Sequence, residues 1–198
     1  MGFLVDKCTF QTLSEELLKE CNQFDCGHGD LNDFFSNDSH AYSKELLGKS
    51  YCFRLDENPN EIVCAFTISN DSIKTSFLPN SRKKKGNKTI PREKQFRSYP
   101  AVLIGRLGVS QKFKKIGLGR ELMNFIKSWF IDPENKTGCR FVVVDSYNED
   151  IPIAYYESNG FQFLFSSEAQ EKEFMSLPED SSLNTRLMYF DLIVLSSQ

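Results

Sequence analysis

The sequence predicts a single α/β domain over residues 1–198, with a mixed β-sheet flanked by helices. The length of 198 residues suits one well-packed domain. The composition, 40% hydrophobic and 26% charged, is that of an ordinary globular chain. Strand-like segments form a hairpin in the first half and alternate with helical segments in the second, so antiparallel and parallel pairs are both expected.

Two amphipathic helices are expected before the hairpin. Thr12 and Glu15 have the spacing of a capping box, which predicts a helix over residues 12–22. The glycine-rich stretch "FDCGHGD" then predicts a loop. From Asp30, apolar residues recur at helical spacing, so a second helix should end near Gly48.

The middle of the chain carries a hairpin, a strand and a helix. Residues 50–55 and 62–69 are rich in β-favouring residues and are joined by the turn-forming "DENPNE". The run "AVLIGRLGV" at residues 101–109 predicts a strand. Residues 117–131 have one apolar face, which predicts a helix packed on the sheet.

The last third predicts three strands around a short helix. The continuous apolar run "CRFVVVDSY", residues 139–147, is typical of a buried strand and should pair in parallel with the strand at residues 101–109. "IPIAYYESNG" predicts a helix with Pro152 in its first turn and Gly160 at its C-terminal cap. "FQFLF" and "TRLMYFDLIVL" complete the sheet.

Composition excludes several classes of protein. No apolar run approaches the roughly 20 residues that span a bilayer, and the N-terminal stretch contains acids where a signal peptide needs apolar residues, so a cytoplasmic protein is expected. The six cysteines lack the paired spacing of a zinc site, and no metal is expected.

Basic residues are concentrated in one segment. The whole chain has a net charge of −3, but residues 81–97 hold eight basic residues against one acid, Glu93. Such a run is either a solvated loop or a contact for phosphates, including those of tRNA. The residues concerned are Arg82, Lys83, Lys84, Lys85, Lys88, Arg92, Lys94 and Arg97.

A glycine-containing turn leads into the helix at residues 117–131. The first N–H groups of a helix and its dipole form an anion site, so this turn is a candidate phosphate site. A nucleotide-triphosphate P-loop is excluded because Gly119 is followed by Arg120 and Glu121 rather than Lys and Ser or Thr. A dinucleotide fingerprint is weak, because Leu122 stands at the third glycine position.

The turn instead resembles the acyl-CoA signature of the GNAT acetyltransferase superfamily, [Q/R]-x-x-G-x-[G/A]. Here it reads "KKIGLG" from Lys114, which stands where Gln or Arg is usual. The later "YYESNGF" is similar to the GNAT motif Y-E-x-x-G-F, at the expected separation. "FDCGHGDLNDFF" and "YPAVLIGRLGV" resemble the GNAT branch that includes toxins acetylating aminoacyl-tRNA.

This resemblance implies that acetyl-CoA lies between two splayed parallel strands. Backbone groups of two strand residues would pair with the pantetheine arm, and the turn would hold the pyrophosphate. The cofactor-binding residues so implied are Leu107, Val109, Lys114, Lys115, Ile116, Gly117, Leu118, Gly119 and Arg120. Asn148 is either a further CoA contact or the cap of the next helix.

The resemblance also implies the catalytic groups. Tyr156 matches the tyrosine that protonates the departing thiolate, whereas Tyr155 lies about 100° around the helix and is assigned to packing or to the substrate wall. Asp145 and Glu149 are candidates for the base, with an exposed loop acid as the alternative reading of each. The amine of an aminoacyl-tRNA has a low pKa and needs no dedicated base.

Three functions are therefore weighed. The first is acetyl transfer to an amine, with aminoacyl-tRNA as one acceptor. The second is acetylation of a small amine or a protein N-terminus, and the third is a catalytically idle module that binds CoA or nucleic acid. The sequence leaves open the acceptor, a homodimer, a neighbouring antitoxin and the role of residues 166–184.

Overall fold

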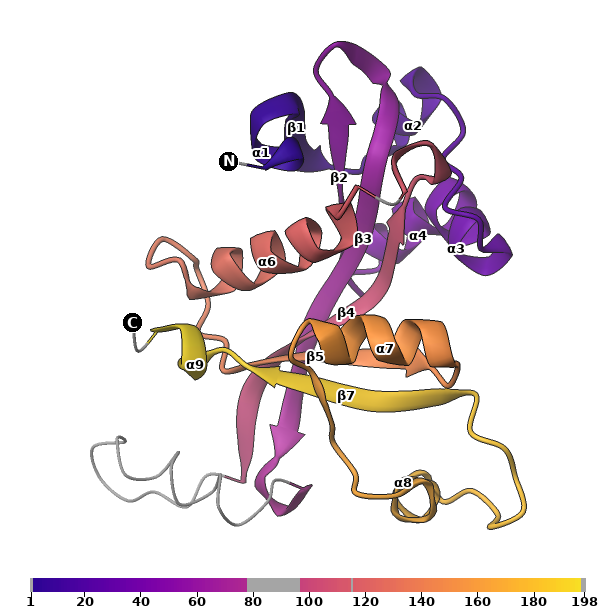
Figure 1. Ribbon diagram of the computed structural model, residues 1–198, viewed down its shortest axis with the longest axis vertical. Helices are drawn as coiled ribbons and strands as arrows, with labels where there is room; N and C mark the ends of the chain where they lie inside the picture. Colours follow the sequence, from indigo (N-terminus) through magenta and orange to yellow (C-terminus); the bar gives the residue numbers. More distant parts are fainter. Residues whose placement is uncertain (1, 78–96, 115, 197–198) are drawn as a thin grey trace. The chain divides into compact units, whose positions relative to one another are not determined.

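A computed structural model describes residues 2–77, 97–114 and 116–196, in two compact units (Figure 1). The first comprises Met1–Ser69 and Ile104–Asp132, and the second Asn70–Leu103 and Pro133–Gln198. Strands β3 (Asn58–Lys74) and β4 (Ser98–Val109) contribute to both. The seven strands follow the order β1-β2-β3-β4-β5-β7-β6, and the expected α/β class is confirmed.

The first unit is built on an antiparallel set of strands. β1 (Cys8–Thr12) pairs with β2 (Lys49–Leu55), and β2 pairs with β3, which confirms the predicted hairpin. β1 itself was not predicted. The capping box expected at Thr12 is wrong, because Thr12 pairs with Tyr51 as the last residue of β1. Ser14 caps the helix instead, and its hydroxyl accepts from the Leu17 N–H at 3.2 Å.

The N-terminal helices are shorter than the sequence suggested. After α1 (Phe3–Lys7) and α2 (Glu15–Glu20), the predicted second helix is divided into α3 (Gly29–Asp33), a π-helical turn η1 (Phe34–Asp38) and α4 (Ser39–Lys44). The π turn retains the amphipathic pattern, since Phe34 and Phe35 are both buried.

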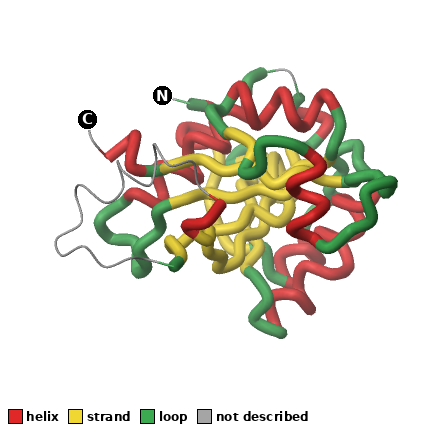
Figure 2. The backbone as a smooth tube through the Cα atoms, turned by 90° about the horizontal axis from the view of Figure 1, so that it is seen from below, coloured by secondary structure: helices red, strands yellow, loops and turns green. Residues whose placement is uncertain are grey.

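Alternating strand residues give this unit a core on each face of its strands. Phe10, Tyr51, Phe53 and Phe66 lie on one face, where they contact Phe125 and Trp129 of α6 (Leu118–Ile131). Residues of the opposite face, including Cys52 and Ala65, pack with the apolar side chains of α2, α3 and η1. Strands and helices are distinguished by colour in Figure 2.

The second unit holds the strands and helices that follow α6 in the chain. It contains β5 (Phe141–Tyr147), α7 (Asp150–Ser158), β6 (Gln162–Phe163), α8 (Glu168–Met175) and β7 (Thr185–Asp191). β7 pairs antiparallel with β5 and with β6. The last strand was predicted four residues too long, because the chain leaves β7 after Asp191 and forms the short helix α9 (Ile193–Ser196). The core includes Tyr99, Phe141 and Tyr189.

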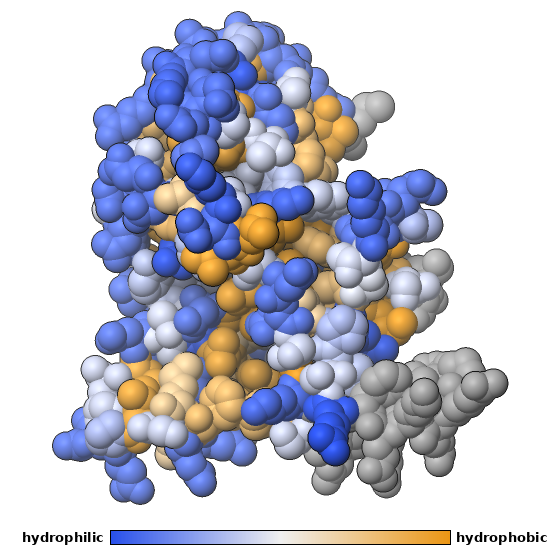
Figure 3. Space-filling view, turned by 180° about the vertical axis from the view of Figure 1, so that it is seen from behind, coloured by the Kyte–Doolittle hydropathy of each residue, from blue (hydrophilic) through white to orange (hydrophobic). Residues whose placement is uncertain are grey.

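An aromatic cluster joins α8 to the end of β3. Phe77, in the 3₁₀ turn η2 (Thr75–Phe77), lies 5.3 Å from Phe165 and 4.7 Å from Phe174, measured between ring centroids. Phe174 is 42% exposed, so part of the cluster reaches the surface. Figure 3 shows such apolar side chains at the surface among hydrophilic ones.

Lys127 is a charged residue buried within α6, with only 5% of its surface exposed. Burial disfavours its ammonium form and lowers its pKa from 10.5 to about 8. We expect Lys127→Met to raise the free energy of unfolding at pH 7 by about 1–3 kcal/mol, since the charged amine no longer has to be desolvated. Urea unfolding at pH 7 measures this gain.

The same substitution should have a pH-dependent effect. Between pH 8 and 10.5 the unfolded chain binds a proton at Lys127 that the folded chain does not bind, so wild-type stability rises with pH in this window. The advantage of Lys127→Met should therefore shrink by pH 9.5. The exposed Lys136 provides a control, because Lys136→Met should leave stability nearly unchanged at both pH values. A pH-independent gain would show that packing, not charge, is responsible.

Candidate active site

The sequence-predicted site residues fall into two groups, one in each compact unit. The residues assigned to CoA, apart from Asn148, belong to the first unit, and those assigned to proton transfer belong to the second. Each group is built by its own local contacts.

The first group lies where β4 leads into α6. Leu107 and Val109 are half-buried residues at the end of β4. The chain then leaves the strand through Ser110, whose N–H donates to the Val63 carbonyl at 2.9 Å, and makes the 3₁₀ turn η3 (Gln111–Phe113). The glycine turn is thus anchored to the sheet on its N-terminal side.

The start of α6 has the geometry that the glycine motif predicted. Gly117 precedes the helix with a φ of 84°, a left-handed conformation that favours glycine. Its carbonyl accepts from the Arg120 N–H at 3.1 Å and the Glu121 N–H at 3.2 Å. The positive end of the helix dipole therefore lies at Leu118 and Gly119.

The side chains of this turn differ in what they can offer a ligand. Leu118 is buried, so only its backbone can contact an anion. Lys114, Ile116 and Arg120 are exposed, and the two cations can supply positive charge. Lys115 lies outside the described residues.

The second group is organised by the C-terminal cap of α7. Gly160 has a φ of 82° and its N–H donates to the Glu157 carbonyl at 2.8 Å, while the Phe161 N–H donates to the Tyr156 carbonyl at 3.0 Å. These two bonds make a Schellman motif. The Tyr156 and Phe161 rings lie 5.4 Å apart, as the hydrophobic contact of that motif requires. The sequence "YYESNGF" thus fixes Tyr156 on its helix.

Tyr156 is held as a neutral phenol. Burial raises its pKa well above the ordinary value of 10, and the carboxylate of Asp145 adds to this rise. Tyr155 packs beside Tyr156 with ring centroids 5.0 Å apart, in an edge arrangement.

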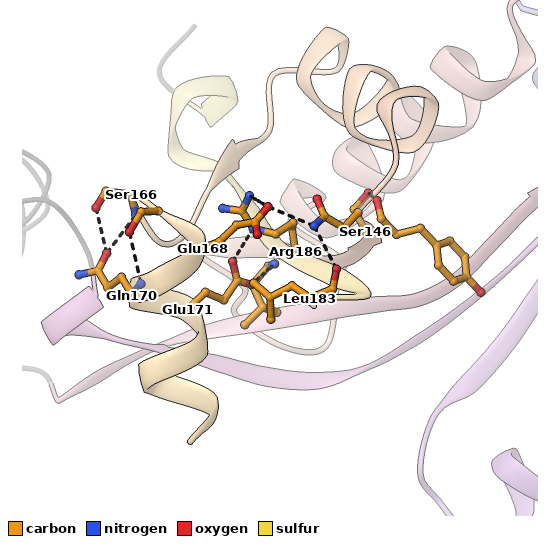
Figure 4. Close-up of polar contacts among 11 residues, drawn as sticks. Ser146, Ser166, Glu168, Gln170, Glu171, Leu183 and Arg186 are labelled. Carbon is orange, nitrogen blue, oxygen red and sulfur yellow. Dashed lines mark hydrogen bonds and ion pairs between the residues drawn. The ribbon is translucent and has the colours of Figure 1, made fainter. Parts of the chain in front are cut away.

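Asn148 and Glu149 connect β5 to α7. Glu149, which is exposed, is the residue that precedes α7, so the expectation that Asn148 caps this helix is wrong. The Asn148 side-chain amide instead donates to the Leu183 carbonyl at 3.0 Å and to Glu168 Oε1 at 3.2 Å. Figure 4 shows these bonds beside the Glu171–Arg186 pair.

The basic segment lies mostly outside the described residues. This applies to Arg82, Lys83, Lys84, Lys85, Lys88, Arg92 and Lys94. Arg97, which is described, is exposed.

Clustered metal ligands and the state of the thiols can be assessed in the part of the chain that the structure describes. Within the described residues, no group of three or more His, Cys, Asp or Glu side chains could hold a metal ion. The six cysteines are free. Burial raises the pKa of Cys8 and Cys139 to about 11 and that of Cys52 to about 12, so these thiols are protonated at neutral pH. No helix in residues 2–77, 97–114 and 116–196 combines the length and the apolar character of a membrane span.

The chain order of β4, α6, β5 and α7 is the one that the resemblance to GNAT proteins implied. Among solved structures, the chain is similar to KacT, crystallised as a tyrosine-to-phenylalanine mutant, with a TM-score of 0.67 and 16% identity over 97% of this chain and 99% of that one. It is also similar to AtaT in complex with acetyl-methionyl-tRNAfMet, with a TM-score of 0.66 and 18% identity over 96% and 98%.

AtaTR bound to AcCoA gives a TM-score of 0.62 and 19% identity, over 97% of this chain and 98% of that one. No protein-family model and no curated protein sequence matches the chain. At these identities the likeness establishes the fold, which extends over nearly the whole chain.

Proposed function

We propose that the chain is an acetyl-CoA-dependent N-acetyltransferase that acetylates a primary amine. The positions of its two motifs carry this proposal. The glycine motif opens α6 directly after β4, and Tyr156 is fixed on the helix that follows β5. The fold shared with AtaTR, whose solved structure contains AcCoA, supports acetyl-CoA as the donor.

The chemistry assigns a separate task to each group. Backbone N–H groups at the start of α6, with Lys114 and Arg120, bind the pyrophosphate, and the end of β4 aligns the pantetheine arm. The neutral amine attacks the thioester carbonyl, and the C–S bond breaks as the tetrahedral intermediate collapses. Tyr156 donates its proton to the departing thiolate, since a phenol with a raised pKa stays protonated at neutral pH.

The proton lost by the attacking amine requires an acceptor. Asp145 is one candidate base, and its carboxylate contributes to the raised pKa of Tyr156. Glu149 is exposed at the start of α7 and would act through water. An amine of low pKa attacks without either group.

Calorimetric titration with acetyl-CoA tests the donor, and thiol release over amines, peptides and charged tRNA tests the acceptor. Binding with thiol release for one acceptor class would support the proposal and identify the substrate. Binding without thiol release for any acceptor would favour the idle CoA-binding module. An absence of acetyl-CoA binding would overturn the proposal.

We propose aminoacyl-tRNA as the acceptor class. AtaT has been solved with acetyl-methionyl-tRNAfMet, and the basic segment at residues 81–97 supplies charge for phosphate contacts. AtaT has also been solved with the antitoxin AtaR and KacTA with DNA, so an antitoxin partner belongs to the same proposal. Acetylation of a small amine or a protein N-terminus is the competing reading, and it gives the basic segment no role.

Reversing the charge of the basic segment separates these readings. We expect replacement of Arg82, Lys83, Lys84 and Lys85 by Glu to lower kcat/KM for charged tRNA by about 100-fold or more, because phosphate contacts dominate nucleic-acid affinity. The Kd for acetyl-CoA should stay within about threefold. Steady-state kinetics at two salt concentrations and calorimetry measure the two effects.

A matched control reverses four exposed lysines elsewhere, Lys7, Lys44, Lys49 and Lys136. This control should retain most of the tRNA activity. Equal losses in the two variants would indicate a general charge effect, and full activity of the first variant would remove the basic segment from the mechanism.

A further inference from the structure

The segment from Phe24 to Asn32 packs against the end of β4 and is hydrogen-bonded to the turn between β4 and α6. Its residues alternate in direction, so that Phe24 and Cys26 are buried while Asp25 lies at the surface. Gly108 of β4 accommodates the buried residues, because a Cβ at this position would lie 3.1 Å from Cys26 Cβ and 3.3 Å from the Phe24 ring.

Asp25 is the centre of a hydrogen-bond cluster that includes this turn. Its Oδ1 accepts from the Gly27 N–H and from Asn32 Nδ2, each at 2.8 Å. Its Oδ2 accepts from Gln111 Nε2 at 2.6 Å, and its backbone carbonyl accepts from the Gln111 N–H at 2.8 Å. These bonds lower the pKa of Asp25, so it is ionised at neutral pH.

Lys114 lies against the same cluster. A Cβ built on Gly27 would be 3.1 Å from Lys114 Nζ and 3.1 Å from Gln111 Cδ. The φ of 79° at Gly27 further disfavours a side chain at this position. Because Gly27 has no side chain, the side chains of Gln111 and Lys114 can occupy the space beside it. The Lys114 charge also contributes to the low pKa of Asp25, which places the ammonium near the carboxylate.

We propose that Asp25 is a positioning residue for the phosphate-binding turn. With Asn32 it holds Gln111 and Lys114 in the conformation that the diphosphate of CoA requires, before CoA binds. The inference rests on the proposed function, because the turn needs a diphosphate ligand. It gives the N-terminal "FDCGHGDLN" stretch a role in donor binding, which the sequence did not predict.

A comparison of two acetyl donors tests this role. Acetyl-CoA carries the diphosphate and S-acetylpantetheine does not. If Asp25 positions the diphosphate-binding turn, its loss should therefore affect only the reaction with acetyl-CoA. We expect Asp25→Ala to lower kcat/KM for acetyl-CoA by about tenfold, mainly through KM, and to leave kcat/KM for S-acetylpantetheine within about twofold. Hydrogen exchange of the amides in residues 110–119 should become faster in this variant.

Two further variants separate the hydrogen bonds from the fold. In Asp25→Asn, Oδ1 can still accept from Gly27 and Asn32, and rotation of the Gln111 amide restores the third bond, so acetyl-CoA kinetics should be largely rescued. Gln111→Ala removes that bond from the other partner, and a selective but smaller loss is expected. Asp33→Ala is the matched control, because Asp33, the last residue of α3, accepts from Asn37 Nδ2 and comes directly after this segment.

The outcomes distinguish this inference from the function on which it rests. Equal losses with both donors, or no loss with either, would overturn the positioning role while the wild-type protein remains an acetyltransferase. A selective loss in Asp33→Ala would also overturn it. If the wild-type protein neither binds nor consumes acetyl-CoA, the proposed function itself fails.

Discussion

Replacing Tyr156 by phenylalanine should lower kcat by about 100-fold or more while the Kd for acetyl-CoA changes by less than about threefold. A positioned general acid contributes roughly 10²–10⁴-fold, and the phenolic hydroxyl is the only group that the substitution removes. The Schellman bonds involve the Tyr156 carbonyl and the ring still contacts Phe161, so the helix should keep its structure. Pre-steady-state thiol release separates the chemical step from product release.

Tyr155→Phe is the matched control for this prediction. It removes the same hydroxyl from the neighbouring position of α7 and should change kcat by less than about threefold. A pH profile adds a second test. Because the pKa of Tyr156 is raised, the phenol stays protonated beyond pH 10, and the wild-type rate should show no alkaline loss from a tyrosine below that pH. Equal rates for wild type and Tyr156→Phe would assign the proton to water or to another group.

The α/β class and most helices and strands could be predicted, because the spacing of hydrophobic residues and the turn-forming residues determine them locally. α6 was predicted within one residue, since its apolar face repeats at helical spacing and a glycine stands before it. The first strand and the true cap at Ser14 were missed. Cys8–Thr12 contains no apolar alternation strong enough to reveal a strand, and its pairing with β2 across more than 35 residues is a tertiary effect.

The local backbone at the candidate site could be predicted where a glycine determines it. Gly160 adopts the positive φ of the C-terminal cap predicted for it, and Gly117, which also has a positive φ, directly precedes α6. Asp25 and Gln111 could not be found in this way, because their contact joins positions 86 residues apart. The hydrogen bonds of Asn148 could not be predicted for a related reason, since its partners Leu183 and Glu168 come from a segment whose helix had not been predicted.

Glu171 is a fully buried carboxylate in that unpredicted helix. Its Oε2 accepts from Arg186 Nε at 2.7 Å, and its Oε1 accepts from the Leu187 N–H at 2.6 Å (Figure 4). The side chain of Arg186 is 10% exposed and its guanidinium lies 4.4 Å from the centre of the Phe163 ring. The pair joins α8 to β7 at a place where solvent cannot replace either partner.

We expect Glu171→Gln to lower the free energy of unfolding by about 3–5 kcal/mol. Removing Glu171 from the buried pair leaves the Arg186 guanidinium with the more exposed Glu168, 3.6 Å away, as its nearby carboxylate. A glutamine also has only one acceptor oxygen at this position, so either Arg186 or Leu187 would face an N–H₂ group. Urea unfolding followed by circular dichroism measures the loss, and hydrogen exchange across residues 165–187 should localise it.

Glu168→Gln provides the control in the same helix. Glu168 lies 3.6 Å from Arg186, but its side chain is 45% exposed, so this pair is screened by solvent and its loss should cost less than about 1 kcal/mol. If the two substitutions destabilise equally, burial of the Glu171–Arg186 pair does not determine the stability of α8. If Glu171→Gln destabilises the protein much more than Glu168→Gln, the desolvated Glu171–Arg186 pair stabilises α8, the helix that the sequence did not predict. Because Asn148 bonds to Glu168 and to Leu183, loss of α8 should then also release the turn that follows β5.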